Sequence, residues 1–206
     1  MILKAKHHFI LDPFLRMYVI RKMHHSFHSI VIKGDTADEN LPLLFIGNHI
    51  SWWDGIWALH INQKLFNRRY FYMMEEEQLR KNWFLNYCGG YSITKNNRSI
   101  IESLQYTAHL LEDKNNLILL FPQGEIRSMH DQIFIFQKGI TKIFQLVRND
   151  IQIVFMANFI DYHSNTRPTV YAYLKNYKDG TALPEMQSAY NNFHHECLSE
   201  HIRNNP

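Results

Sequence analysis

Short apolar runs alternate with longer amphipathic stretches along this chain, and that alternation limits the folds it can adopt. The runs are "LLFIGN" at 43–48, "RYFYMME" at 69–75, "NLILLF" at 116–121 and "IQIVFMANF" at 151–159. Runs of this length, apolar at consecutive positions, are typical of strands buried on both faces. Helical patterns separate them, so the sequence predicts an α/β fold: a single layered domain with a largely parallel central sheet flanked by helices.

The other predicted elements complete this pattern within 206 residues, a length that suits one domain with a sizeable core. We expect further strands at 27–32, 91–94 and 169–174, and helices at 13–25, 53–62, 75–87, 98–113, 133–147 and 184–202. Asp12 is predicted to cap the first helix, with Pro13 at its first position. Gly89 and Gly90 are expected to end the third helix, and Gly139 weakens the fifth.

The composition and the spacing of cysteines and histidines argue against several classes of partner and site. A formal charge of +3, with no zinc-finger spacing and no aromatic RNA-binding pattern, argues against a nucleic-acid partner. Cys88 and Cys197 are far apart and outside any CxxC pattern, which favours a reducing compartment without disulfides. The clustered histidines have no carboxylate or cysteine at a ligand spacing, so we expect no metal site.

The N-terminal region has two interpretations. It lacks the features of a signal peptide, and no apolar run in the chain approaches the roughly 18–20 residues that a spanning helix needs. The predicted N-terminal amphipathic helix carries Phe14, Met17 and Tyr18 beside the basic residues Arg21 and Lys22. It is either a packing helix with a solvated basic edge or an interfacial helix that rests on anionic lipid headgroups.

A histidine and an aspartate follow the strand at 43–48. His49 lies at the carboxyl end of that strand, where ligands bind in open α/β sheets, and Asp54 comes five residues later. A histidine there is suited to general-base catalysis, with the aspartate accepting its second ring N–H. No GxSxG motif marks a nucleophile, and nothing marks Ser51 as activated. The alternative is a structural pair at a strand-to-helix joint.

Two further stretches carry candidate binding residues. In "GGYSITKNNRS" at 89–99, Lys95 and Arg98 follow a short strand and are candidates to bind phosphate or another anion. In "LLFPQGEIRS" at 119–128, Gly124 permits close backbone approach and Arg127 is a candidate anion clamp. Each stretch by itself also fits an ordinary solvated loop.

Taken in order, these stretches resemble the motifs of the glycerolipid acyltransferase superfamily, the lysophospholipid acyltransferases. Asn48, His49 and Asp54 match its NHx4D block, and Gly90 to Lys95 is similar to its second block, which ends in a basic residue. Phe121, Pro122 and Gly124 match its FPEGTRS block. The stretch "FQKG" at 136–139 is similar to the FKxG that commonly follows, so the resemblance covers about residues 28–175.

This resemblance implies a membrane-associated O-acyltransferase of phospholipid biosynthesis. His49 would be the general base and Asp54 its orienting partner. The substrate-binding candidates are Asn48, Lys95, Arg98, Phe121, Pro122, Gln123, Gly124, Glu125 and Arg127. No cofactor is implied: the acyl donor would be acyl-CoA or acyl carrier protein, and the acceptor a lipid hydroxyl such as that of a 1-acylglycerol-3-phosphate. We expect residues 1–27 to form a membrane-surface helix region and 28–206 the acyltransferase domain, peripheral (monotopic) on the cytoplasmic face of a membrane.

The third block departs from the family pattern. Gln123 replaces the usual Glu, Glu125 replaces Thr, and Ile126 moves Arg127 one position along. In the family that arginine is associated with the acceptor phosphate, so a non-phosphate lipid acceptor, such as a glycolipid, carotenoid or aminolipid, is the alternative. A catalytically inactive lipid-binding protein, or a hydrolase that uses the same dyad to activate water, are further alternatives.

Overall fold

The chain folds around one mixed sheet. The computed structural model describes residues 2–34, 36–94 and 97–204, and in the last range it describes side chains from residue 99 onward. The strands of the sheet, in the order β1-β7-β6-β2-β5-β3-β4, are as follows: β1 (Ser29–Lys33), β2 (Leu43–Gly47), β3 (Arg69–Glu75), β4 (Gly90–Ile93), β5 (Asn116–Leu120), β6 (Gln152–Asp161) and β7 (Thr169–Tyr177). β2 to β6 are mutually parallel. β7 runs antiparallel to β6, and β1 pairs in parallel with β7. The predicted single-domain α/β fold is therefore confirmed.

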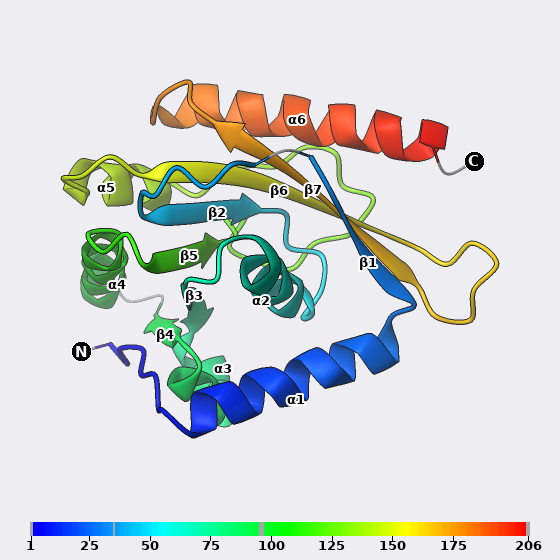
Figure 1. The fold of residues 1–206 in the computed structure, drawn as a ribbon. Coiled ribbons are helices and arrows are strands. Elements are labelled where there is room, and N and C mark those ends of the chain that lie inside the picture. Colours follow the sequence, from blue (N-terminus) through cyan, green and yellow to red (C-terminus); the bar gives the residue numbers. More distant parts are fainter. Residues whose placement is uncertain (1, 35, 95–96, 205–206) are drawn as a thin grey trace.

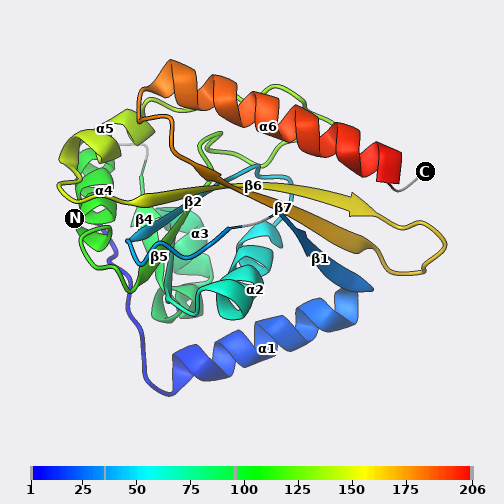
Figure 2. The same cartoon turned by 45° about the horizontal axis from the view of Figure 1, so that its top comes forward.

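Helices cover both faces of this sheet (Figure 1). They are α1 (Leu11–Ser26), α2 (Asp54–Leu65), α3 (Glu76–Lys81), the 3-10 helix η1 (Trp83–Tyr87), α4 (Asn97–Leu110), α5 (Gly139–Leu146) and α6 (Leu183–Asn204). Side chains of α4, α5 and α6 share one core with the sheet. α1 and α2 pack on the opposite face, and the turned view separates α6 from α1 across the sheet (Figure 2).

The strands fall close to the predicted ranges, and two helices do not. Residues 75–87 form two short helices instead of one, because the chain leaves helical geometry at Asn82 (φ −113°, ψ 54°). The helix expected over 133–147 begins only at Gly139. Before it, Phe134 and Phe136 are buried while Ile133 and Ile135 are exposed. This two-residue period belongs to extended chain, not to a helix.

Side-chain amides of α6 hold that extended segment. The backbone N–H of Phe134 donates to Asn191 Oδ1, and that of Phe136 donates to Gln187 Oε1, both at 2.8 Å. These bonds satisfy backbone groups that a helix would have satisfied internally. The local apolar content alone therefore mispredicted the segment, because its partners lie about fifty residues further along the chain.

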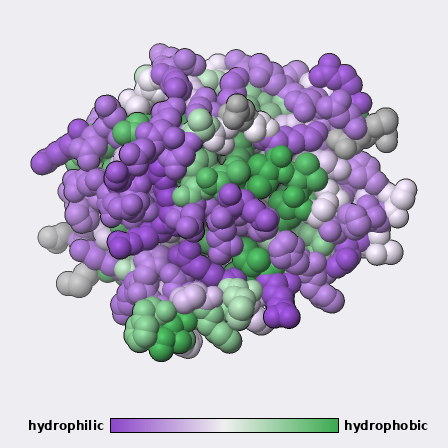
Figure 3. All heavy atoms as spheres, viewed as in Figure 1, coloured by the Kyte–Doolittle hydropathy of each residue, from purple (hydrophilic) through white to green (hydrophobic). Residues whose placement is uncertain are grey.

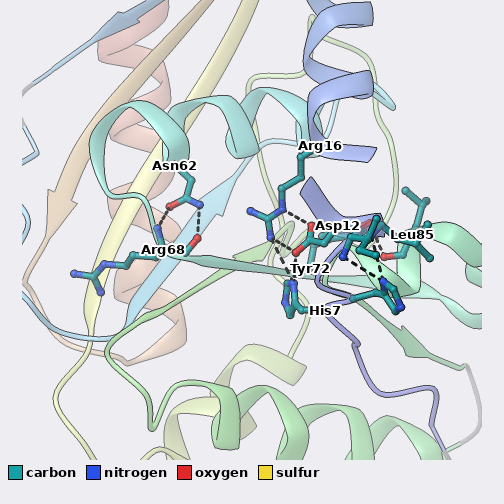
Figure 4. Close-up of polar contacts among 10 residues, drawn as sticks. His7, Asp12, Arg16, Asn62, Arg68, Tyr72 and Leu85 are labelled. Carbon is teal, nitrogen blue, oxygen red and sulfur yellow. Dashed lines mark hydrogen bonds and ion pairs between the residues drawn. The ribbon is translucent and has the colours of Figure 1, made fainter. Parts of the chain in front are cut away.

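The first turn of α1 buries a charged residue, Asp12. Asp12, predicted as its N-cap, lies inside the first turn instead, and helical geometry begins at Leu11 without a side-chain cap. The Asp12 carboxylate accepts hydrogen bonds from His7 Nδ1 at 2.6 Å and from Arg16 Nη2 at 3.0 Å, beside Tyr72 of β3 (Figure 4). Since charged groups buried at an interface must be paired, this cluster fixes which side of α1 faces the protein.

The opposite side of α1 presents its apolar residues to solvent. Phe14 is 57% exposed, Met17 58% and Tyr18 53%, and Phe9 and Ile10 just before the helix are also exposed. Figure 3 shows apolar side chains on the lower edge of the molecule, where α1 runs in Figure 1. α1 also packs on the sheet, because Met23 is fully buried and Val19 and Ile20 pack against the core. The helix therefore packs through one side and exposes apolar residues on the other, and its interfacial role stays a prediction.

The chain reversal before β4 depends on a glycine, and this gives a prediction. Gly89 has φ +96°, and a Cβ built there would lie 1.9 Å from the carbonyl oxygen of Tyr70. We expect Gly89→Ala to lower the free energy of unfolding by about 3 kcal/mol or more, from a strained backbone and a steric overlap together. Denaturant unfolding measures it.

Gly180 supplies the matched control. It has a similar φ of +102°, but an added Cβ meets nothing within 4 Å. Gly180→Ala should therefore cost only about 1 kcal/mol, from backbone strain alone. Equal losses in the two variants would show that the close approach of Tyr70 has no role.

Candidate active site

The passage from the carboxyl end of β2 into α2 brings the predicted pair together. His49 Nδ1 lies 2.8 Å from Asp54 Oδ2. The same carboxylate oxygen accepts the backbone N–H of Ile50 at 2.7 Å and that of Ser51 at 2.9 Å. One oxygen atom thus holds both the imidazole and the backbone between strand and helix. When Asp54 is ionised, Nδ1 carries the proton and Nε2 is the basic nitrogen.

The surroundings of the two side chains differ sharply. Asp54 is fully buried at the start of α2, whereas the His49 side chain is 22% exposed. Burial raises the pKa of Asp54 above its ordinary value, against the hydrogen bonds from His49 and from the backbone of Ser51. No described residue forms a hydrogen bond with His49 Nε2. The basic nitrogen therefore lies on His49, the partly exposed residue of the pair, where a substrate proton can reach it.

The segment after β5 fixes the position of the His49 ring and backbone. Phe121 stacks on the imidazole, with ring centroids 4.1 Å apart and planes inclined by 5°. Gln123 Oε1 accepts the backbone N–H of His49 at 2.7 Å, and the backbone N–H of Arg127 donates to the His49 carbonyl at 2.9 Å. Contacts on the ring and on both sides of the backbone leave His49 little freedom to rotate away from Asp54.

A second set of contacts fixes the end of β2. The side chain of Asn48 pairs with the backbone of Asn158 on β6, donating to its carbonyl at 3.0 Å and accepting its N–H at 2.9 Å. Tyr190 of α6 donates its hydroxyl to the Met156 carbonyl at 2.8 Å, and the Asn48 backbone also hydrogen-bonds to this hydroxyl. Asn48 is therefore anchored immediately before His49.

Several residues predicted to bind substrate have structural contacts here. Asn48 and Gln123 are 1% and 4% exposed, and their bonded atoms meet protein backbone. Pro122 is buried, and its carbonyl accepts the backbone N–H of Gln137. Gly124 has φ +77°, the left-handed conformation that glycine favours. Their direct contact with substrate stays a prediction.

The charged candidates lie on the surface or outside the described part. Arg127 Nη2 is 2.6 Å from Glu125 Oε1, and both side chains are more than half exposed. Lys95, and the side chain of Arg98, lie outside the described residues, so their predicted role is untested. Within the described residues, no group of three or more His, Cys, Asp or Glu side chains is arranged to hold a metal ion.

Sequence reasoning missed Asn158 and Tyr190. Asn158 carries a signal, because it is a polar residue inside the otherwise apolar run at 151–159. Tyr190 carries none, because its pattern on α6 is that of an ordinary core residue. Its position beside the paired strands β2 and β6 follows from tertiary packing alone.

Comparison with protein families identifies one match. The family model described as Acyltransferase matches residues 28–158, from just before β1 to Asn158 on β6, and so includes every residue of the site described above except Tyr190. A search of curated proteins returned no match.

Because Asp54 Oδ2 accepts three hydrogen bonds, we predict that two substitutions of Asp54 differ in their effect on stability. Asp54→Ala should lower the free energy of unfolding by about 2–5 kcal/mol, because two partly buried backbone N–H groups lose their acceptor and a small cavity forms at a fully buried position. Asp54→Asn keeps an oxygen that can accept the same bonds and removes a buried charge, so its stability should stay within about 1 kcal/mol of the wild type.

Denaturant unfolding of both variants checks this expectation. An Ala variant as stable as the Asn variant would contradict it, because the carboxylate would then have no role in holding residues 50 and 51.

Proposed function

The chain belongs to the acyltransferase family, and from this premise we propose that it is a membrane-associated O-acyltransferase that moves a fatty acyl group from acyl-CoA or acyl carrier protein to a lipid hydroxyl. The observation that carries this proposal is the pairing of His49 Nδ1 with Asp54 Oδ2, which leaves Nε2 as a base on the partly exposed side. Acyl transfer to a hydroxyl requires such a base.

The proposed reaction proceeds by direct attack. Nε2 of His49 takes the proton of the acceptor hydroxyl as its oxygen attacks the thioester carbonyl, and Asp54 stabilises the resulting imidazolium. The C–S bond then breaks, and the imidazolium returns its proton to the thiolate. Ser51 is not placed as a nucleophile: its hydroxyl accepts the backbone N–H of Trp53 at 3.2 Å, as part of the turn into α2. An acyl-enzyme is therefore not required.

The acceptor is either a 1-acylglycerol-3-phosphate or a lipid without a phosphate. We propose that Lys95, Arg98 and Arg127 bind the anionic groups of the donor or the acceptor. Phe121, Pro122, Gly124 and Glu125, in the same segment as Arg127, are further proposed substrate contacts. The ion pair of Arg127 with Glu125 favours the second acceptor class, because a guanidinium already paired offers less to a phosphate.

Membrane association is proposed through α1. The helix carries Phe14, Met17 and Tyr18 on its exposed side, with Arg21 and Lys22 exposed at its carboxyl half. Apolar side chains would enter the headgroup region while cations meet anionic lipids. Among the described residues, no helix has the length and hydrophobicity needed to cross a bilayer. Cys88 and Cys197 are free thiols, which agrees with a peripheral position on the cytoplasmic face.

The function is tested by an acyl-transfer assay with His49→Ala. Wild-type protein, labelled acyl-CoA or acyl carrier protein and a lipid extract should give a labelled lipid, and the variant should lose at least about a thousandfold in kcat. Mass spectrometry of the product distinguishes a phosphate-bearing acceptor from a neutral one. His109, an exposed histidine outside the site, supplies a control variant, His109→Ala, that should keep full activity.

Undiminished turnover in a folded His49→Ala variant would refute the assignment of the base. Release of free fatty acid without a labelled lipid would indicate a hydrolase. Lipid binding without any product, from either donor, would favour the inactive lipid-binding alternative.

Vesicle binding tests α1. The triple variant Phe14→Ser/Met17→Ser/Tyr18→Ser should lose at least about tenfold in partitioning to anionic phospholipid vesicles, because three exposed apolar side chains no longer enter the bilayer. Ile202→Ser is the matched control, since Ile202 is 63% exposed but lies on α6. Equal co-sedimentation of the triple variant and the control would exclude α1 as the membrane contact.

A further inference from the structure

Asp54 of the catalytic pair and two other buried side chains have polar atoms without a partner among the described residues. They are Asp54 Oδ1, Trp57 Nε1 and both amide atoms of Asn158. Asp54 and Trp57 are fully buried and Asn158 is 1% exposed. Such atoms are rare in folded proteins, because a buried polar group that gives up water without gaining a partner destabilises the fold. Several of them in one region indicate a site for a small polar ligand.

The three side chains belong to one layer of the molecule, between α2 and the sheet. Asp54 and Trp57 are three positions apart on α2 and therefore share a face. On β6, Met156 and Ile160 pack against the α1 and α2 side of the sheet, and Asn158 alternates with them on that same face. Ile160 packs in one cluster with Trp57, and Asn158 is paired through its backbone with Asn48, next to His49.

One water molecule has the donors and acceptors needed to form hydrogen bonds with all of these atoms. The indole Nε1–H and the amide Nδ2–H are donors, and a water oxygen accepts two such bonds. The carboxylate Oδ1 and the amide Oδ1 are acceptors, and a water donates two. We propose that Asp54, Trp57 and Asn158 enclose a tightly bound water behind the catalytic pair. Besides Asp54, this site is formed by Trp57 and Asn158, which are not part of the dyad and do not touch the reacting atoms.

The water would complete the solvation of the Asp54 carboxylate. Its Oδ2 atom already accepts three hydrogen bonds, from His49 and two backbone N–H groups, while Oδ1 accepts none from the described residues. A donor on Oδ1 stabilises the ionised carboxylate, and an ionised carboxylate is what stabilises the imidazolium during transfer. Trp57 and Asn158 are thus positioning residues, and this kinetic consequence rests on the proposed function.

The first test is a crystal structure of the wild-type protein at about 1.8 Å resolution or better. We expect one ordered water within hydrogen-bonding distance of Asp54 Oδ1, Trp57 Nε1 and the Asn158 amide. This outcome does not depend on any activity. Direct contacts among the three side chains, with no water between them, would overturn the proposal while leaving the proposed function unaffected.

The second test is kinetic. Asn158→Leu and Trp57→Phe each remove the polar atoms of one side chain from the water site, and each should lower kcat about tenfold with KM for donor and acceptor unchanged. The double variant should fall no further than either single variant, because both act through the same water. Tyr177→Phe is the control: its hydroxyl is also buried without a partner, but it lies beside Ile153 at the far end of β6, and kcat should be unchanged.

A loss of about a hundredfold in the double variant would mean that the two side chains act independently, which contradicts a shared water. A change in KM of the same size as the change in kcat would indicate a general structural role instead. If one variant fails to fold, the crystal structure of the wild type still decides whether the water is present.

Discussion

The geometry of the candidate active site depends on the hydrogen bonds of a single carboxylate oxygen. Asp54 Oδ2 accepts the Nδ1–H of His49 and two backbone N–H groups, and it does so fully buried at the first turn of α2. Burial raises the pKa of this carboxyl, so the protein must supply enough hydrogen bonds to keep it ionised. The sharp passage from β2 into α2, the tautomer of His49 and the charge opposite the imidazole all depend on these bonds.

The rest of the fold holds the strand end to which this oxygen is attached. The Asn48 side chain extends the pairing of β2 with β6, and the Tyr190 hydroxyl from α6 bridges the same two strands. Gln123 and Phe121, from the end of β5, fix the backbone and ring of His49. Four elements, β2, β5, β6 and α6, thus meet around Asn48 and His49. Such contacts would hold His49 in position for its proposed role as a base.

The N-terminal helix packs through one side and exposes apolar residues on the other. Asp12 is buried and paired with His7 and Arg16, and Met23 is fully buried further along the helix. Phe14 and Met17 face solvent. A pattern of apolar residues on a helix usually identifies the side that packs. Here apolar residues lie on both sides, and the pairing of the Asp12 charge permits its burial, because a buried charge without a partner would destabilise the fold.

The sequence by itself determined the α/β class, the approximate position of each strand, and the pairing of His49 with Asp54, because continuous apolar runs and a His-x4-Asp spacing are local properties of the chain. It mispredicted residues 133–137, because the partners that decide their conformation are distant side chains on α6. It also mispredicted the role of Asp12, which pairs with the nearby His7 and Arg16 instead of capping α1. Only the tertiary structure decided that Asn158 and Tyr190 support the site, that Gln123 binds backbone, and that Arg127 is paired with Glu125. All of these contacts except the Arg127–Glu125 pair join segments that are far apart in the sequence. Long crossover segments separate neighbouring parallel strands, so no local pattern shows which strand ends will lie side by side.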